Sequence, residues 1–274
     1  PASAESKITP RTKALIAVDY AGQPCDWDAL RALADRRGLA LAADGRHALG
    51  ATYAGRPVGS LADLTCFSFH PVKHIATGEG GAVATARPDL DASVRRLRNH
   101  GIATDHRQRE AAGTWYYEMQ ELGFNYRLCD ILCALGLSQL GKLPAWLARR
   151  RELAARYARL LAPLAGVEPL ALLPGREHAW HLYVVQVAPD LAGEGRRRVF
   201  EHLRGAGVGV NVHYVPVHLH PYYRARLGTG PGLCPHAEAA YERIVSLPLY
   251  PGLSDADQDR VVAALAEALR RAAG

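Results

Sequence analysis

The chain lacks the features that mark membrane, secreted and fibrous proteins. Its 274 residues contain no run of eighteen apolar residues, so the sequence predicts no transmembrane helix and no membrane partner. Residues 1–7 have no apolar core of the kind found in secretory signals. No internal repeat or low-complexity segment interrupts the chain. The composition, 49% hydrophobic and 22% charged, is that of an ordinary globular protein.

Cysteine is scarce and shows no pairing pattern. The five cysteines are Cys25, Cys66, Cys129, Cys133 and Cys234. An odd, scattered set is typical of a reducing compartment, so we expect a cytoplasmic protein. Cys129 and Cys133 lie four residues apart on a predicted helix. No histidine pair accompanies them at ligand spacing, which favours a packed helix face over a metal site.

The net charge of +6 allows two interpretations. It reflects either an arginine-rich composition spread over solvated helices or attraction for an anionic partner. The basic clusters have no interleaved aromatic residues and belong to no recognition module, so we expect no nucleic-acid partner. An anionic nucleotide-linked sugar would suit the charge, although the charge alone does not argue for it.

Strand and helix patterns alternate in the first half of the chain. The predicted strands are residues 13–18, 39–43, 64–69 and 81–85, and the predicted helices are residues 26–37 and 88–100. This alternation favours an α/β layer with a mostly parallel sheet, in which ligands bind at the carboxyl ends of the strands.

The second half has a different pattern. Residues 102–122 are predicted to form a long loop, followed by two long helices on either side of Pro144. Further predictions are strands at 180–188 and 209–217, a helix at 195–205, and a last helix that Ser254 and Asp257 cap and Gly274 ends. We therefore expect the C-terminal portion of a large domain in residues 1–143 and a smaller α+β domain in residues 144–274.

One lysine has an unusual setting. Lys73 lies on a short turn between the apolar runs 64–69 and 81–84. A lysine in such a turn is poorly solvated, and only its neutral amine can attack a carbonyl and form a Schiff base. Ser68, five residues earlier, and the Gly80-Gly81 pair after the turn fit a phosphate anchor and a close approach of the backbone.

A carboxylate ends the preceding strand. Asp44 follows the apolar run 39–43, where it can pair with the protonated pyridine nitrogen of pyridoxal 5′-phosphate (PLP), the partner that makes PLP an electron sink. Alone, Lys73 would be interpreted as a solvated surface charge and Asp44 as a turn former or helix cap. Their order along the chain, together with Ser68, is far more specific and predicts a PLP site.

Three segments carry a resemblance to a known family. They are Asp44-x-x-His47-Ala-x-Gly50, Ser68-Phe-x-x-x-Lys73-x-Ile-x-Thr-x-Glu79-Gly-Gly81 and Gly123-Phe-Asn125-Tyr-Arg127-Leu. In these segments the chain resembles the DegT-type sugar aminotransferases, which are fold-type I PLP-dependent enzymes acting on nucleotide-linked keto-sugars. The resemblance implies a mostly parallel central sheet with helices on both faces and a smaller C-terminal α+β domain.

A softer similarity points to the pseudaminic-acid branch of this family. Val18-Asp-Tyr-Ala-Gly22, His181-Leu-Tyr183 and Val212-His-Tyr214 resemble that branch, which aminates C4 of a UDP-linked 4-keto-6-deoxy-N-acetylhexosamine. The implied substrates are that nucleotide sugar and an amino-acid donor, glutamate. Two alternatives stay open. One is a PLP-dependent sugar dehydratase, against which Lys73 argues because such enzymes carry histidine there. The other is a truncated, non-catalytic remnant.

The resemblance implies a role for each matching residue. Lys73 would form the Schiff base and carry the proton, Asp44 would pair with the pyridinium, and Ser68 would bind the phosphate. His47 would lie near the ring oxygen of the cofactor, or would be a core histidine. Gly45 and Arg46 depart from the small residues usual in the family, so Arg46 would have to point away from the cofactor.

Further residues are implied at a subunit interface and a sugar pocket. Asn125 would reach the phosphate of the neighbouring subunit's cofactor, which implies a homodimer with a shared active site, or would be a turn residue. Asn211, His213 and Tyr214 would bind the nucleotide sugar. A competing metal site at His213, His218 and His220 matches no standard zinc spacing, so we expect no metal.

The resemblance begins well inside the family pattern. The chain starts at Pro1, its only methionine is Met119, and the first predicted strand follows within a few residues. The phosphate turn and ring-stacking aromatic that precede this strand in the family have no counterpart in the 274 residues. We therefore expect a C-terminal part of such an enzyme, and weak PLP binding with little activity for the isolated chain.

Overall fold

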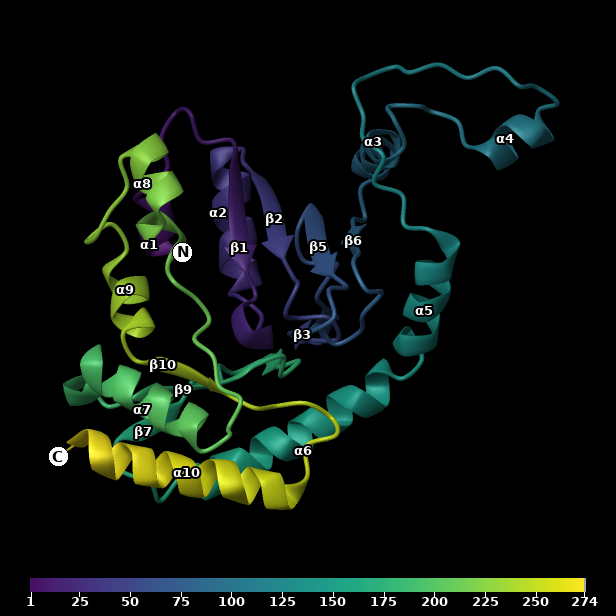
Figure 1. The fold of residues 1–274 in the computed structure, drawn as a ribbon. Helices are drawn as coiled ribbons and strands as arrows, with labels where there is room; N and C mark the ends of the chain where they lie inside the picture. Colours follow the sequence, from purple (N-terminus) through teal and green to yellow (C-terminus); the bar gives the residue numbers. More distant parts are fainter. Residues whose placement is uncertain (274) are drawn as a thin grey trace. The chain divides into compact units, whose positions relative to one another are not determined.

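The computed structural model describes residues 1–273, which form two compact units. Unit 1 comprises Pro1–Ala145 and Pro174–Ala179. Unit 2 comprises Trp146–Leu173 and the chain from Trp180 onward. Figure 1 colours both units along the chain.

Unit 1 is built on a four-stranded sheet of order β1-β2-β5-β6 (Figure 1). Its strands are β1 (Ala14–Val18), β2 (Ala40–Asp44), β5 (Leu64–Ser68) and β6 (Gly81–Ala84). β1, β2 and β5 run parallel, and β6 pairs antiparallel with β5. The predicted mostly parallel α/β sheet is thus confirmed.

Helix α2 (Trp27–Arg37) joins β1 to β2 and packs against β2. Asp26 caps it by accepting a hydrogen bond from the Ala29 N–H, and Gly38 ends it in the left-handed conformation, with φ of 61°. Glycine adopts this conformation without the steric cost of a Cβ atom, so the helix ends where the sequence predicts.

Smaller elements complete unit 1. They are the antiparallel strands β3 (Thr52–Tyr53), β4 (Arg56–Pro57) and β8 (Arg176–Glu177), the turn η1 (Tyr20–Gly22) and the helices α1 (Ala2–Glu5), α3 (Pro88–Arg98), α4 (His106–Ala111) and α5 (Asp130–Leu140). The predicted loop 102–122 was wrong in one respect, since it contains α4. A capping box of Asp105 and Gln108 nucleates this short helix.

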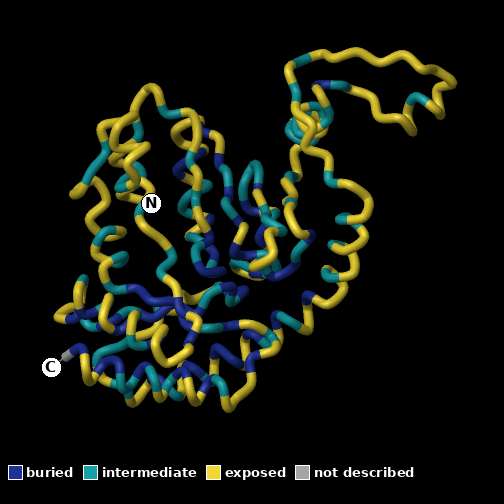
Figure 2. Tube along the Cα trace, in the orientation of Figure 1, coloured by how far each residue is buried: buried dark blue, intermediate teal, exposed yellow. Residues whose placement is uncertain are grey.

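Unit 2 is an α+β layer, as predicted. Its antiparallel sheet has the order β10-β9-β7, formed by β7 (Val167–Pro169), β9 (Tyr183–Val187) and β10 (Ile244–Leu247). Its long helices are α6 (Leu143–Leu161), which starts in unit 1, α7 (Glu194–Gly205) and α10 (Asp255–Ala273). The η2 turn is Pro189–Leu191. Buried leucines and valines of these elements form one core, visible as dark stretches in Figure 2.

The cap predicted for the last helix is confirmed. The Asp257 N–H donates to Ser254 Oγ at 3.0 Å, and the hydroxyl donates to Asp257 Oδ2 at 2.7 Å. The predicted end at Gly274 lies outside the described residues.

The strand predicted at residues 209–217 is wrong. Only Asn211 pairs with Ser246, as an isolated bridge, and the chain then turns into η3 (Val217–Leu219). Pro216 has no N–H to donate, so the ladder cannot continue through it. The helices α8 (Pro221–Leu227) and α9 (Pro235–Tyr241), which the sequence did not predict, follow.

Helix α5 differs from the other long helices. Its sequence DILCALGLSQL is mostly apolar, yet none of its residues is buried (Figure 2). Among residues 1–273 no single helix is long and apolar enough to cross a membrane, and only α5 and α6 taken together as a bent pair meet that requirement of length and composition.

Candidate active site

Asp44 and Ser68 end two neighbouring parallel strands. Asp44 is the last residue of β2 and pairs with Cys66, two residues before Ser68 ends β5. The carboxyl ends of parallel strands meet at one edge of a sheet, which is where ligands bind in α/β folds. The structure therefore brings the predicted carboxylate and hydroxyl to the same edge.

The turn that carries Lys73 closes onto this edge. The N–H of Phe69 donates to the Gly80 carbonyl at 2.9 Å, and the N–H of Thr77 donates to the Phe69 carbonyl at 2.9 Å. Within the turn, the N–H of Lys73 donates to the His70 carbonyl at 2.9 Å. These bonds hold the turn that carries Lys73 at the end of β5.

Glycine is required where the turn returns to the sheet. Gly81 pairs with Ser68, and a Cβ atom on Gly81 would lie 2.6 Å from the Phe67 carbonyl oxygen. Gly80 has a φ of +153°, and its Cβ would lie 2.5 Å from Thr77 Oγ1. Gly81 thus lies close to the strand that precedes Lys73, whereas Gly80 lies close to Thr77.

The Lys73 amine is half-buried. Burial lowers the pKa of Lys73, and the nearby Arg46 guanidinium lowers it further, while Asp44 raises it. A lowered pKa enlarges the fraction of neutral amine, the form that attacks a carbonyl. The Lys73 amine is therefore poorly solvated, as the apolar flanks of this turn predict.

Asp44 is held by Arg46. Asp44 Oδ1 accepts a hydrogen bond from the Arg46 N–H at 3.2 Å, and Arg46 Nε lies 3.3 Å from Asp44 Oδ2. The sequence-based expectation was that Arg46 turns away from this site. In the structure its side chain turns toward the carboxylate instead, because the two opposite charges are only two residues apart on one turn.

His47 and Ser68 complete the predicted set in unit 1. His47 is fully buried, next to the strand end that carries Asp44. Ser68 Oγ accepts a hydrogen bond from the His70 N–H at 3.3 Å. The sheet edge thus offers an amine, a carboxylate and a hydroxyl, the groups that suit the aldehyde, ring nitrogen and phosphate of PLP. These residues fit the cofactor.

The sequence reasoning missed Asp19. This residue follows β1 and is fully buried. Its N–H donates to the Asp44 carbonyl at 3.1 Å, and its Oδ1 accepts from the Cys25 N–H at 2.8 Å and from Trp27 Nε1 at 3.1 Å. Burial raises the pKa of Asp19 to about 6, and Asp44 contributes to the rise. An aspartate directly after an apolar strand was the available signal, as it was for Asp44.

Asn125 lies elsewhere in unit 1. It forms an isolated bridge with Asn99, just after α3, and its Oδ1 accepts from Arg127 Nε at 3.1 Å. Its side chain is exposed. Asn125 therefore contacts Asn99 and Arg127, whereas Asp44 and Lys73 have their contacts at the carboxyl ends of β2 and β5.

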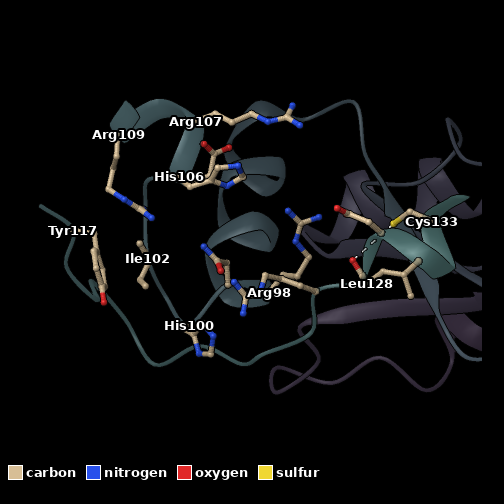
Figure 3. A pocket seen from close by; sticks show the side chains of 13 residues that line it. Arg98, His100, Ile102, His106, Arg107, Arg109, Tyr117, Leu128 and Cys133 are labelled. Atoms are coloured by element: carbon tan, nitrogen blue, oxygen red, sulfur yellow. Dashed lines mark hydrogen bonds between the residues drawn. The ribbon is translucent and has the colours of Figure 1, made fainter. Parts of the chain in front are cut away.

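Beside Asn125 is a cationic cavity of about 600 Å³ (Figure 3). Its basic lining residues are Arg98, His100, His106, Arg107, Arg109 and Arg127. Arg109 stacks over the Tyr117 ring, 5.0 Å from its centroid, and Figure 3 shows this pair on the opposite side of the cavity from Leu128 and Cys133. Asp105 and Asp130 supply the only carboxylates of the lining, so cations outnumber anions in it.

The predicted sugar-binding residues lie in unit 2. His213 Nδ1 is 2.8 Å from Ser246 Oγ, and the rings of His213 and Tyr214 meet edge to face at 4.7 Å. Tyr214 is 46% exposed and Asn211 is also exposed, so both can be reached by a ligand.

Two of the three histidines weighed as metal ligands have other partners. His218 Nε2 lies 2.8 Å from Glu238 Oε1, while His213 contacts Ser246. Within the described part of the chain no group of three histidine, cysteine, aspartate or glutamate residues is arranged to hold a metal ion.

The comparison with known families decides the identity. A sequence model described as the DegT/DnrJ/EryC1/StrS aminotransferase family matches residues 1–266. The chain belongs to this family. The predicted fold class, the aminotransferase activity class and the PLP dependence of the family are thereby confirmed.

Individual relatives agree with this assignment. The chain is 40% identical over 275 residues to the spore coat polysaccharide biosynthesis protein SpsC of Bacillus subtilis, covering 99% of this chain and 70% of SpsC. The putative sugar aminotransferase Spr1654 of Streptococcus pneumoniae, in its PMP form, superposes with a TM-score of 0.91 at 32% identity, over 98% of this chain and 72% of Spr1654.

A third relative concerns the predicted branch. Helicobacter pylori PseC, an aminotransferase involved in the biosynthesis of pseudaminic acid, superposes with a TM-score of 0.90 at 31% identity, over 97% of this chain and 69% of PseC. PseC is similar to this chain to the same degree as Spr1654. The similarity therefore supports the family and leaves the branch a matter for proposal.

Proposed function

We propose that this protein transfers an amino group from glutamate to the C4 keto group of a UDP-linked 4-keto-6-deoxy sugar. The observation that carries the proposal is the placement of Lys73, Asp44 and Ser68 at one sheet edge of a sugar-aminotransferase fold. The product would serve cell-surface glycan or nonulosonic acid biosynthesis. The names of SpsC and PseC, which refer to a spore coat polysaccharide and to pseudaminic acid, support this role.

Each residue at the edge has a distinct task. When bound, PLP supplies the electron sink that lets a carbon-bound hydrogen leave as a proton. Lys73 Nζ takes that proton from the α-carbon of glutamate and returns a proton at C4 of the sugar. Asp44 would hold a positive charge at the ring nitrogen, Ser68 Oγ would bind the phosphate, and His47 would lie near the ring oxygen.

Two further sets of residues, one in each unit, carry groups that suit a sugar nucleotide. The cationic cavity lined by Arg98, Arg109 and Arg127 suits the diphosphate of the nucleotide. In unit 2, Asn211, His213 and Tyr214 present amide, imidazole and phenol groups that suit hydroxyl and N-acetyl groups. Both sets support a nucleotide-linked sugar over a simple keto acid.

We further propose a homodimer with a shared active site. The apolar helix α5 buries none of its residues, and Ile131 and Leu137 are 81% and 71% exposed. Such a helix is stabilised when a second subunit covers it. Asn125 precedes this helix and would reach the partner's cofactor phosphate. All five cysteines are free thiols, in keeping with a reducing compartment, so we place the reaction in the cytoplasm.

The experiment that tests the proposal uses borohydride and peptide mapping. Reduction of the PLP-treated protein should fix a pyridoxyl group on Lys73, and Lys73→Ala should lose both the label and the transamination of the UDP-linked keto-sugar. The control is Lys142→Ala, which removes an exposed lysine of unit 1. Label on another lysine would refute the site. A labelled protein that aminates only keto acids would refute the substrate.

A further inference from the structure

Helix α5 packs one face against the turn that carries Lys73. Four of its eleven residues are half-buried, and these are Leu132, Cys133, Gly136 and Gln139. Residues three or four apart lie on the same side of a helix, so these four form one stripe. The other seven residues are exposed. α5 therefore has one inward face, and two members of that face contact the turn.

Gln139 makes the polar contact with the turn. Its Oε1 accepts a hydrogen bond from the backbone N–H of Ala76 at 2.7 Å. Ala76 lies three residues after Lys73. The hydrogen bonds within the turn use the N–H groups of Phe69, Lys73 and Thr77, so the glutamine supplies the acceptor for a further one. A half-buried donor of this kind is costly to leave without an acceptor.

Gly136 makes the steric contact. A Cβ atom on Gly136 would lie 2.9 Å from Thr77 Cγ2, well inside the usual separation of two carbon atoms. Thr77 has little room to yield, because it is 1% exposed and its Oγ1 donates to the Glu79 carbonyl at 2.8 Å. Glycine at position 136 thus lets α5 come close enough for Gln139 to reach the turn.

The chain before Lys73 and the chain after it have different surroundings. Val72, just before the lysine, is 62% exposed. After the lysine, residues 74, 75 and 77 are buried, and His74 Nε2 lies 2.8 Å from the Ala179 carbonyl oxygen. Lys73 is therefore held mainly from its C-terminal side, by the same segment that is bonded to α5.

We propose that Gln139 is a positioning residue for Lys73, which holds the turn against α5 so that the amine stays half-buried at the sheet edge. This inference rests on the proposed function, in which Lys73 forms the Schiff base. Gln139 acts through the backbone of residue 76 and not through the reacting atoms. Burial lowers the pKa of Lys73, so a turn released from α5 would admit water to the amine and raise that pKa.

The reactivity of Lys73 toward trinitrobenzenesulfonate, measured against pH and located by peptide mapping, tests the proposal. Only the neutral amine reacts, so the midpoint of the pH profile reports the pKa. Gln139→Leu removes the acceptor and should raise this midpoint, while the charges of Arg46 and Asp44 stay unchanged. The matched control is Gln120→Leu, the same substitution at an exposed glutamine of unit 1, which should leave the midpoint unaltered. An unaltered midpoint in Gln139→Leu overturns the proposal.

Hydrogen exchange distinguishes release of the turn from general unfolding. Gln139→Leu should speed exchange in residues 74–77 by about two- to tenfold, the range expected for one hydrogen bond, while residues 40–44 of β2 keep their rates. Faster exchange in both segments would mean a general structural role and overturns the proposal. Gln139→Glu keeps an acceptor for the Ala76 N–H and should exchange as the wild type does.

Gly136→Ala tests the same contact surface in a different way. Alanine favours a helix more than glycine does, so this substitution should stabilise α5 itself. Its methyl group would nevertheless push α5 away from Thr77, and the midpoint for Lys73 should rise as it does in Gln139→Leu. A more stable protein with an unaltered midpoint would contradict the proposal.

Borohydride labelling separates this proposal from the proposed function. A pyridoxyl group on Lys73, together with an unaltered midpoint in Gln139→Leu, removes only the role of Gln139. Label on another lysine of the wild-type protein removes the proposed function and the role of Gln139 with it.

Discussion

Two five-residue strands of this protein are both mostly apolar and have opposite environments. β9, with the sequence YVVQV, lies in unit 2 and has four of its five residues buried. β1, with the sequence ALIAV, lies in unit 1 and has none buried. Ile16 of β1 is 73% exposed, whereas Val185 of β9 is completely buried.

The helices show the same contrast. α7 carries its apolar residues on one stripe and buries Val199 and Leu203 against α10 and the sheet. α5 is mostly apolar and has no fully buried residue. Unit 2 therefore buries its apolar surface against its own elements. Unit 1, which carries the chemical groups of the site, leaves the apolar faces of β1 and α5 exposed. An apolar sequence therefore predicts a buried face only where other elements of the same unit pack against that face.

The largest expected effect comes from matched leucines in the two units. Leu203→Ala should lower the free energy of unfolding by about 2–5 kcal/mol, because it leaves a cavity in a closed core. Leu137→Ala on α5 should change the free energy of unfolding of a single subunit by less than about 0.5 kcal/mol, since Leu137 is exposed when no partner subunit covers α5. Urea denaturation of both variants measures the difference. Equal losses would mean that α5 is covered in solution.

A pH-dependent effect comes from Asp19, the buried carboxyl of unit 1. Its pKa is raised to about 6, so the folded state binds more protons than the unfolded state between about pH 4 and pH 6. Stability should therefore fall as the pH rises through this window, by about 3 kcal/mol in total.

Asp19→Asn removes this titration while keeping Oδ1 as the acceptor for Cys25 and Trp27. The stability difference between wild type and this variant should change by about 3 kcal/mol from pH 4 to pH 7, with the wild type losing stability relative to the variant. Urea titrations at the two pH values give that difference. A pH-independent difference would show that Asp19 is hydrated.

The smallest expected effect is the difference in stability cost between Val→Thr on β9 and Val→Thr on β1. Val→Thr keeps the shape of the side chain and adds a hydroxyl. Val185→Thr buries that hydroxyl in the core of unit 2 and should cost about 1–3 kcal/mol. Val18→Thr on β1, where the valine is 41% exposed, should cost less than about 0.5 kcal/mol. If thermal unfolding showed a large loss of stability for Val18→Thr, the contrast between the exposed β1 and the buried β9 would be contradicted.

Local signals predicted much of the site and the fold. The apolar flanks of the Lys73 turn, the aspartate after residues 39–43 and the cap at Ser254 all depend on neighbours within a few residues. The prediction for 209–217 was wrong because alternating polar residues gave a strand pattern while Pro216 removed a donor. The direction of Arg46 and the burial of Asp19 were missed because each depends on contacts that the pattern does not contain.

The sequence by itself determined the strand-end positions of Asp44 and Ser68 and the setting of Lys73, since short-range periodicity and turn chemistry decide these, and its motifs carried the resemblance to the family. Only the tertiary structure decided that β1 and β2 bring Asp19 beside Asp44, that Arg46 holds Asp44, and that α5 stays uncovered while α7 is buried. The physical reason is that burial and charge pairing depend on which segments meet in space. These contacts form between residues that lie far apart along the chain, or depend on which of two neighbours a side chain turns toward. The local sequence pattern carries no information on either.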